Sequence, residues 1–165
     1  MTEYVAQQMP IVEATLARRG ELISALERQH LEYRPAPTSP TLGDLCRESG
    51  AVQRAYIESF RTFQLRLPRV AAGPGSLAEL AAWFTGLDGA LIEVVSALTD
   101  DQLQRSVDRG LGAAPAAIHL HIYREALLIF YAKAQVYAKA LGLALPEEFR
   151  WWLGDLEDLP EPETN

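Results

Sequence analysis

The chain has few of the features that mark secreted, membrane-spanning or disulfide-stabilised proteins. Cys46 is its only cysteine, so no internal disulfide can form, which is typical of a reducing compartment. No apolar run approaches the ~18–20 residues needed to cross a membrane. The first residues, Met1 to Tyr4, contain no basic region followed by an apolar stretch, so we expect no secretory signal. These absences predict a cytoplasmic protein that does not contact a membrane.

Positive charge is also scarce. Lysine and arginine number 15 against 22 aspartate and glutamate residues, which gives a net charge of −7 and a pI of about 5.0. The densest basic spots are Arg18-Arg19 and the scattered Arg61, Arg66 and Arg69, and neither forms a stripe. Because an acidic surface without a basic patch repels nucleic acid, we expect no nucleic-acid partner.

The motifs of common enzyme classes are missing. The sequence contains no glycine-rich phosphate loop, no nucleophile elbow and no Cys-x-x-Cys pair. No stretch shows the strict alternation of a half-buried β-strand, so we expect no sheet. Motifs of this kind therefore assign no reaction to the chain.

Helical patterns account for most of the chain. Apolar residues recur every three or four positions, which is the spacing of one helical face, and proline, glycine and capping residues separate the helical stretches. A first long helix is predicted over residues 11–30, with an alternative start near Glu3 and a kink at Pro10. The other predicted helices run from Ser39 or Thr41 to before Pro68, from 76 to 98, from 115 to 141, and from 146 to 153.

We therefore predict an all-α fold, a four-helix bundle with a short C-terminal helix, formed by residues 1–154 as one domain. Residues 155–165 carry five acids and no base, so we expect a disordered acidic tail. Large apolar residues on the helical faces are predicted to form the core. They include Phe60, Phe63, Trp83, Phe84, Leu91, Leu127 and Phe130.

The three histidines do not form a metal-binding pattern. His30 ends the first predicted helix, where the helix dipole favours a cation and we expect contact with water. His119 and His121 are two positions apart on one helix, so they point to different sides and cannot both bind one metal ion. His119 shares a helical face, predicted to point inward, with Tyr123, Ala126 and Phe130.

Three more side chains could take part in a functional site or could have only a structural role. His121 lies four positions before Glu125, and we interpret the two as a surface ion pair. Glu48 lies near Val52 at the edge of an apolar face, where its carboxylate could turn to solvent, contact a partner inside the bundle or bind a metal. Solvent is the commonest of these outcomes. We interpret Cys46 as a buried and inert thiol.

Several segments together resemble the DinB-like and YfiT-like proteins. Residues 31–37 (LEYRPAP) and 41–45 (TLGDL) are similar to the segment that leads into the second helix of those proteins. Residues 98–103 (LTDDQL) resemble a turn in that family, and residues 131–146 resemble the run that closes its last long helix. These segments occur in the family's order and cover nearly the whole chain.

This resemblance implies a four-helix bundle that is often dimeric, so we expect a homodimer. Many family members hold a divalent metal through three histidines, one on the second helix and two in an HxxxH on the last. With Gly142 aligned on the family's glycine, these positions carry Glu48, Ala126 and Phe130. One carboxylate, one methyl group and one phenyl ring cannot hold a transition metal, because catalytic sites use about three protein ligands. The resemblance thus implies a lost metal site, and we expect no bound metal or other cofactor.

Three hypotheses about function follow. In the first, the protein is a non-catalytic domain that binds a small molecule or a partner in the remnant pocket. The candidate lining residues of that pocket are Glu48, His119, Tyr123, Ala126 and Phe130. In the second, it is a metal-dependent hydrolase or a thiol S-transferase of the bacillithiol or mycothiol type. That enzyme would need a rebuilt site of Glu48, His119 and Tyr123, with His119 and Glu48 facing one cavity. In the third, the protein is a structural dimer with a filled core.

Overall fold

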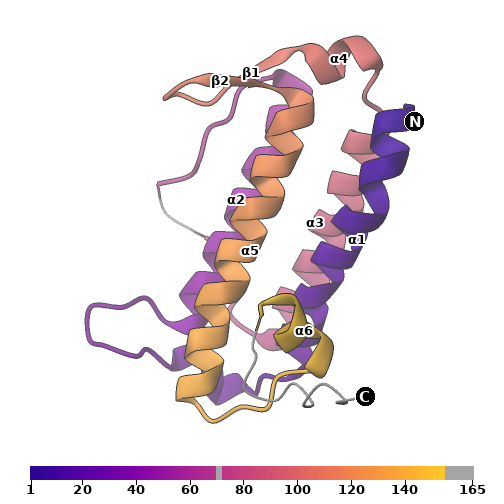
Figure 1. Ribbon diagram of the computed structural model, residues 1–165. Helices are drawn as coiled ribbons and strands as arrows, with labels where there is room; N and C mark the ends of the chain where they lie inside the picture. Colours follow the sequence, from indigo (N-terminus) through magenta and orange to yellow (C-terminus); the bar gives the residue numbers. More distant parts are fainter. Residues whose placement is uncertain (70–71, 155–165) are drawn as a thin grey trace, which may run out of the picture.

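The computed structural model describes residues 1–69 and 72–154, and four long helices dominate it (Figure 1). They are α1 (Glu3–Ser24), α2 (Leu42–Thr62), α3 (Leu77–Ser96) and α5 (Ala116–Ala140). These helices confirm the predicted all-α bundle. The acidic segment 155–165, which we predicted to be disordered, lies outside the described residues.

Shorter elements connect the long helices and close the two ends of the bundle. They are η1 (Arg28–Glu32), α4 (Asp100–Gln104), β1 (Ser106–Asp108), β2 (Ala113–Pro115) and α6 (Glu147–Trp152). The prediction of no sheet was wrong, because β1 and β2 pair as an antiparallel ribbon. Strands of three residues are too short to produce a recognisable alternation in sequence.

The order of the helices around the bundle differs from their order in the chain. α3 packs against both α1 and α2, and α5 also packs against both α1 and α2. α1 and α5 run in the same direction, since the Tyr4 hydroxyl donates to Ala117 O at 2.9 Å and the Tyr131 hydroxyl donates to Thr15 O at 2.7 Å. α2 and α3 both run the opposite way, so the chain between them returns along the length of the bundle (Figure 1).

The predicted starts of α2 and α3 are confirmed by their caps, and for the first helix the alternative start near Glu3 is confirmed in place of residue 11. Thr41 and Asp44 form a reciprocal capping box at the start of α2, and Ser76 and Glu79 form another at the start of α3. Thr2 accepts a hydrogen bond from the Val5 amide, so α1 begins at Glu3 and continues through Pro10.

The end of the first helix was predicted too late in the chain. α1 stops at Ser24, and His30 belongs to η1 instead of the end of a long helix. There the His30 Nδ1 atom accepts a hydrogen bond from the Glu27 amide at 2.9 Å, which caps a new helical turn. A local side-chain cap of this kind interrupts a helix without glycine or proline, so the apolar spacing did not reveal it.

The core fills the space between the four long helices. Six of the seven predicted core residues are buried, namely Phe60, Phe63, Phe84, Leu91, Leu127 and Phe130. The seventh, Trp83, is only half-buried, and its ring lies over Gly50 of α2 and stacks on Phe84 with ring centroids 5.7 Å apart. Within residues 1–69 and 72–154, no helix is long and apolar enough to cross a membrane.

Candidate functional site

A pocket of about 180 Å³ lies between α2 and α5. Its walls come from one face of each helix, because the lining positions recur at intervals of about one helical turn. α2 contributes Leu45, Glu48, Ser49 and Val52, and α5 contributes Tyr123, Ala126, Leu127, Ile129, Phe130 and Lys133. Most of these side chains are apolar, and Glu48 and Lys133 supply exposed opposite charges.

Four of the five candidate pocket residues line this one cavity. Glu48 is exposed on α2, while Tyr123, Ala126 and Phe130 come from α5. Tyr123 is 1% exposed, so its hydroxyl lies deep within the bundle. The fifth candidate, His119, lies one helical turn before Tyr123, near the hairpin end of the bundle.

His119 is a completely buried core residue with partners for both ring nitrogens. The Ser59 hydroxyl donates to Tyr56 O at 2.7 Å, so its oxygen is free to accept a hydrogen bond from His119 Nε2 at 2.7 Å. Arg109 in the hairpin donates to His119 Nδ1, also at 2.7 Å. Together these contacts assign His119 a proton on Nε2 and none on Nδ1.

The surroundings of His119 keep its ring uncharged. Burial and the nearby Arg109 guanidinium lower the pKa of His119 to about 4. The ring also stacks on Tyr56, with centroids 4.6 Å apart. Both nitrogens of His119 are already in use away from the pocket, so the rebuilt site of Glu48, His119 and Tyr123 does not assemble in this arrangement.

His121 has different partners from those predicted. It was expected to pair with Glu125, but its Nε2 lies 2.9 Å from the Tyr4 hydroxyl oxygen and its Nδ1 lies 3.4 Å from Arg124 Nη1. Because α1 packs beside α5, Tyr4 can reach this side of the helix. These contacts tie the start of α1 to α5 and leave His121 without a role in the pocket.

A buried polar cluster lies next to the pocket and was missed by the sequence analysis. Arg19 of α1 is fully buried and forms an ion pair with Asp88 of α3. Gln53 of α2 donates to Asp88 Oδ1 at 2.8 Å. The Arg19 guanidinium also lies over the Phe84 ring, 4.0 Å from its centroid. Tyr123 connects this cluster to the pocket, so all four long helices contribute to the combined region.

Several buried polar atoms of this cluster have no hydrogen-bond partner in the described parts of the chain. They are Arg19 Nε, Arg19 Nη1, Gln53 Oε1 and the Tyr123 hydroxyl oxygen. Burial raises the pKa of Tyr123, and the charge and hydrogen-bonding capacity of the nearby Arg19 guanidinium oppose that rise. Burial also raises the pKa of Asp88, against the opposing effects of Arg19 and Gln53. Buried polar groups without a partner are costly in free energy, which makes this cluster a candidate binding region.

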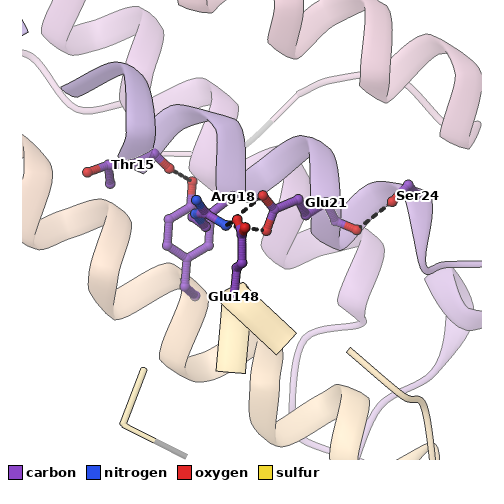
Figure 2. A network of polar contacts seen from close by, with 6 residues as sticks. Thr15, Arg18, Glu21, Ser24 and Glu148 are labelled. Carbon is purple, nitrogen blue, oxygen red and sulfur yellow. Dashed lines mark hydrogen bonds and ion pairs between the residues drawn. The ribbon is translucent and has the colours of Figure 1, made fainter. Parts of the chain in front are cut away.

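The sequence did contain a signal for Arg19. It falls on the apolar face of α1 between Leu16 and Ile23, at the three-and-four spacing of residues that point inward. The Arg18-Arg19 pair was considered only as a basic spot, and the burial of Arg19 was not predicted. Figure 2 shows Arg18 beside Glu21 and Glu148, and its Nη1 lies 2.7 Å from a carboxylate oxygen of each.

The remaining candidate, Cys46, is buried within the core. Its burial was predicted, and burial raises the pKa of the thiol to about 12, so the group stays protonated. Across residues 1–69 and 72–154, no group of three or more histidine, cysteine, aspartate or glutamate side chains is placed to hold a metal ion.

This arrangement defines the class of protein to which the chain is similar in structure, the DinB-like four-helix bundles. One such solved structure is YjoA, a DinB-like protein of Bacillus subtilis, which superposes with a TM-score of 0.66 at 19% identity over 83% of this chain and 95% of that one. Another is a DinB-like protein of Bacillus cereus, with a TM-score of 0.68 at 18% identity over 87% of this chain and 93% of that one.

These likenesses show that the chain has the DinB-like fold. No protein-family model matches the sequence, and no curated protein matches it. Because one fold supports many activities, function has to be argued from the residues of the site.

Proposed function

We propose that the protein binds a small molecule in the pocket between α2 and α5 and does not use a metal ion. The observation that carries this proposal is the largely apolar pocket, whose wall includes Tyr123, a residue whose buried hydroxyl has no hydrogen-bond partner among the described residues. A ligand that exchanged a hydrogen bond with this hydroxyl would remove the cost of leaving it unsatisfied. Pockets that bind small molecules combine an apolar lining with a few such polar groups.

The pocket's size and lining restrict the ligand. A volume of about 180 Å³ is below the range of about 300–1,000 Å³ typical of drug-sized ligands, so the occupant is compact. Leu45, Val52, Leu127 and Phe130 surround it with apolar surface. The ligand therefore has a small apolar body and one hydrogen-bonding group directed at Tyr123.

The pocket offers few groups for acid–base or nucleophilic catalysis, and its two ionisable side chains of opposite charge, Glu48 and Lys133, are both exposed. Because burial raises the pKa of Tyr123, its hydroxyl stays neutral at physiological pH and cannot act as a base. Ser49 lines the pocket, but a serine needs an adjacent base to become a nucleophile. The one histidine nearby, His119, is engaged by Ser59 and Arg109. Binding without turnover is the function that this chemistry supports.

The alternative hypothesis, a metal-dependent hydrolase or thiol S-transferase, requires a set of ligands. At the family's three metal positions the pocket presents Glu48, Ala126 and Phe130. A single carboxylate does not replace the three protein ligands of a catalytic site. The residues present therefore do not fit a transition metal, and the alternative has less support than ligand binding.

The binding proposal can be tested by filling the pocket. Phenol, indole and isobutanol are suitable probes, since each joins an apolar body to one hydrogen-bonding group. We expect at least one to raise the melting temperature of the wild-type protein. Ala126→Phe should abolish that shift, and Tyr123→Phe should weaken binding about fivefold, the effect of one lost hydrogen bond. Ala82→Phe adds the same ring to an exposed position of α3 and should leave binding unchanged.

Two results would contradict the proposal. One is an equal thermal shift in the wild-type protein and in Ala126→Phe, which would place the probe elsewhere. The other is stoichiometric metal in the untagged protein that is lost in Glu48→Ala or His119→Ala. That second result would establish a rebuilt metal site and make the metal-dependent enzyme the leading hypothesis.

A further inference from the structure

Two side chains of opposite charge line the pocket between α2 and α5 without pairing with each other. Glu48 comes from α2 and Lys133 from α5, and both are exposed residues. Among the described residues, neither side chain forms an ion pair or a hydrogen bond. Opposite charges that border one pocket and stay unpaired leave room between them for a ligand that carries both signs.

Hydrogen bonds at both ends of the contact between α2 and α5 define the register of these antiparallel helices. Near the hairpin, His119 Nε2 of α5 lies 2.7 Å from Ser59 Oγ of α2. At the other end, the Tyr137 hydroxyl of α5 donates to Pro40 O, just before α2, at 2.9 Å. Nearly equal numbers of residues separate these two contacts on the two helices, so the positions between them can be aligned by counting.

This register places the two charges at the same end of the pocket. Glu48, eleven positions before Ser59, lies level with Phe130, eleven positions after His119. Lys133 follows Phe130 by three positions, which is ~4.5 Å along the helix axis. Because a side chain leans towards the N-terminus of its own helix and the two helices are antiparallel, Glu48 and Lys133 lean towards each other.

The opposite end of the pocket is buried. Tyr123 lies ten positions before Lys133, ~15 Å along the axis of α5, and is only 1% exposed. Val52 of α2 and Ala126 of α5 line the pocket between Tyr123 and the charges. The pocket therefore has a charged end at the surface and an apolar part that extends into the bundle.

We propose that the ligand of this pocket is a neutral α-amino acid. Its ammonium group lies at Glu48, its carboxylate lies at Lys133, and its side chain fills the apolar part of the pocket. The α-carbon joins these three substituents, which match the two charges and the apolar walls. This assignment rests on the proposed small-molecule binding and names the class of ligand.

Ligands of a single charge match the pocket less well than a zwitterion does. A carboxylic acid would gain a contact with Lys133 but would place its carboxylate near Glu48, and an amine would meet the reverse problem. Glu48 also borders a second hollow of α2, which Arg69 lines. Arg69 does not line the pocket itself, so it provides a control for the role of nearby positive charge.

Calorimetric titration of the full chain at low ionic strength tests the assignment with L-methionine. This amino acid is a suitable probe because its side chain is apolar and its sulfur is a weak hydrogen-bond acceptor for Tyr123. The analogues 3-(methylthio)propylamine and 4-(methylthio)butanoate lack the carboxylate and the ammonium group, respectively. Each should bind about fivefold or more weakly than L-methionine, the effect of one lost charged contact. D-methionine should also bind more weakly, since it cannot place all three substituents at once.

Charge variants of the pocket should change these affinities in opposite directions. Glu48→Gln should weaken binding of L-methionine and the amine but strengthen binding of the acid, because it removes a like charge from the acid. Lys133→Gln should weaken binding of L-methionine and the acid but strengthen binding of the amine. Arg69→Gln should leave all three affinities unchanged. A general loss of stability cannot produce opposite changes for two ligands of one variant.

The double variant Glu48→Lys/Lys133→Glu exchanges the positions of the two charges while the apolar part of the pocket stays in place. It should therefore make D-methionine the tighter-binding enantiomer. The uncharged probes phenol, indole and isobutanol report on the pocket alone. If one of them binds there but L-methionine binds no more tightly than its analogues or its enantiomer, the amino-acid assignment is wrong and small-molecule binding stands. If no probe binds, both proposals fail.

Discussion

Arg19 and His119 show two ways in which a bundle core can hold a basic side chain. Arg19 keeps its charge and is paired with Asp88, whereas His119 is held neutral between Ser59 and Arg109. The difference follows from their intrinsic pKa values, because an arginine cannot be deprotonated in a protein and a histidine can. The histidine therefore makes stability depend on pH.

We predict that the protein loses stability as the pH falls from about 6.5 towards 4. The pKa of His119 is about 4 in the folded state and near 6.5 in the unfolded state, so the unfolded state binds more protons in this range. The stabilisation is complete above pH 6.5 and decreases below it. Between about pH 7.5 and pH 5, urea titrations should show a loss of about 2 kcal/mol in the free energy of unfolding.

Two variants show whether His119 causes this loss. His119→Leu removes the titrating group, so the dependence in this range should flatten, although the protein will be less stable at every pH. His30→Gln removes an imidazole outside the core and should retain the wild-type dependence. The stability contributed by Asp44, whose pKa is lowered to about 2 by hydrogen bonds from Arg47 and Thr41, is lost only below about pH 3.8. An unchanged dependence in His119→Leu would contradict the assignment.

For single residues, the sequence predicted which face of a helix a side chain lies on better than it predicted which residues that side chain contacts. The spacing of Tyr123, Ala126 and Phe130 indicated that they share one face of a helix, and that face could be predicted. It did not indicate that His119, on the same face, lies too far along the helix axis to join Glu48. Distances along an axis between two different helices depend on how the helices are staggered, which periodicity does not contain.

Among the elements, α2 and α3 are brought together by a glycine. Gly50 is buried on α2, and a Cβ atom placed there would lie 2.3 Å from the Trp83 ring. That ring is held by Phe84 and lies near Arg54, whose guanidinium carbon is 5.3 Å from the ring centroid. Because Gly50 has no side chain, the Trp83 ring can pack over the contact between the parallel helices α2 and α3.

We expect Gly50→Ala to lower the free energy of unfolding by about 1–3 kcal/mol, because Trp83 must move away from its packed position. Gly86→Ala, on α3, is the matched control. A Cβ atom there meets nothing within 4 Å, so the change should stabilise the protein by about 0.5–1 kcal/mol through helix propensity. Chemical denaturation measures both, and a stabilising Gly50→Ala would show that Trp83 does not fix this joint.

The long helices were largely predictable from the sequence. The end of α1 and the short β-hairpin were not. Capping residues such as Thr41 and Ser76 identified the starts of α2 and α3 because a cap is a local interaction. The hairpin of β1 and β2 depends instead on pairing across a turn, helped by Gly110 at φ 84°. β1 also pairs with a distant segment, because Leu65 N donates to Asp108 O and Asp108 N donates to Phe63 O, and no local pattern records this pairing.

In the molecule as a whole, the polar cluster connects all four long helices. Arg19, Gln53 and Asp88 come from α1, α2 and α3, and Tyr123 comes from α5. A cluster of this kind contributes little net stability when it is intact, but it is expensive to break, because one partner is then left charged inside the core. Replacing one charged partner of the cluster should therefore lower the free energy of unfolding more than replacing both partners together.

We predict that Asp88→Ala lowers the free energy of unfolding by about 2–4 kcal/mol, since it leaves the buried Arg19 guanidinium unpaired. The estimate is below the range for fully buried pairs because the Asp88 side chain is 24% exposed. The double variant Arg19→Met/Asp88→Leu removes both charges and should lose much less. Urea denaturation of the wild type, Arg19→Met, Asp88→Leu and the double variant completes a double-mutant cycle, and additive losses would show that the pair is not coupled.

The return of the chain between α2 and α3 has a consequence for the order of folding. Leu65 N donates to Asp108 O, and Asp108 N donates to Phe63 O, so the backbone of the segment that leaves α2 pairs with β1, which follows α3 and α4 in the chain. During synthesis the end of α2 must wait for residues made later. A bundle in which consecutive helices are antiparallel neighbours can form from contacts that are local in sequence. In this bundle, the segment after α2 pairs with β1, so a long loop has to close first. That raises its contact order and is expected to slow its folding relative to simpler helical bundles.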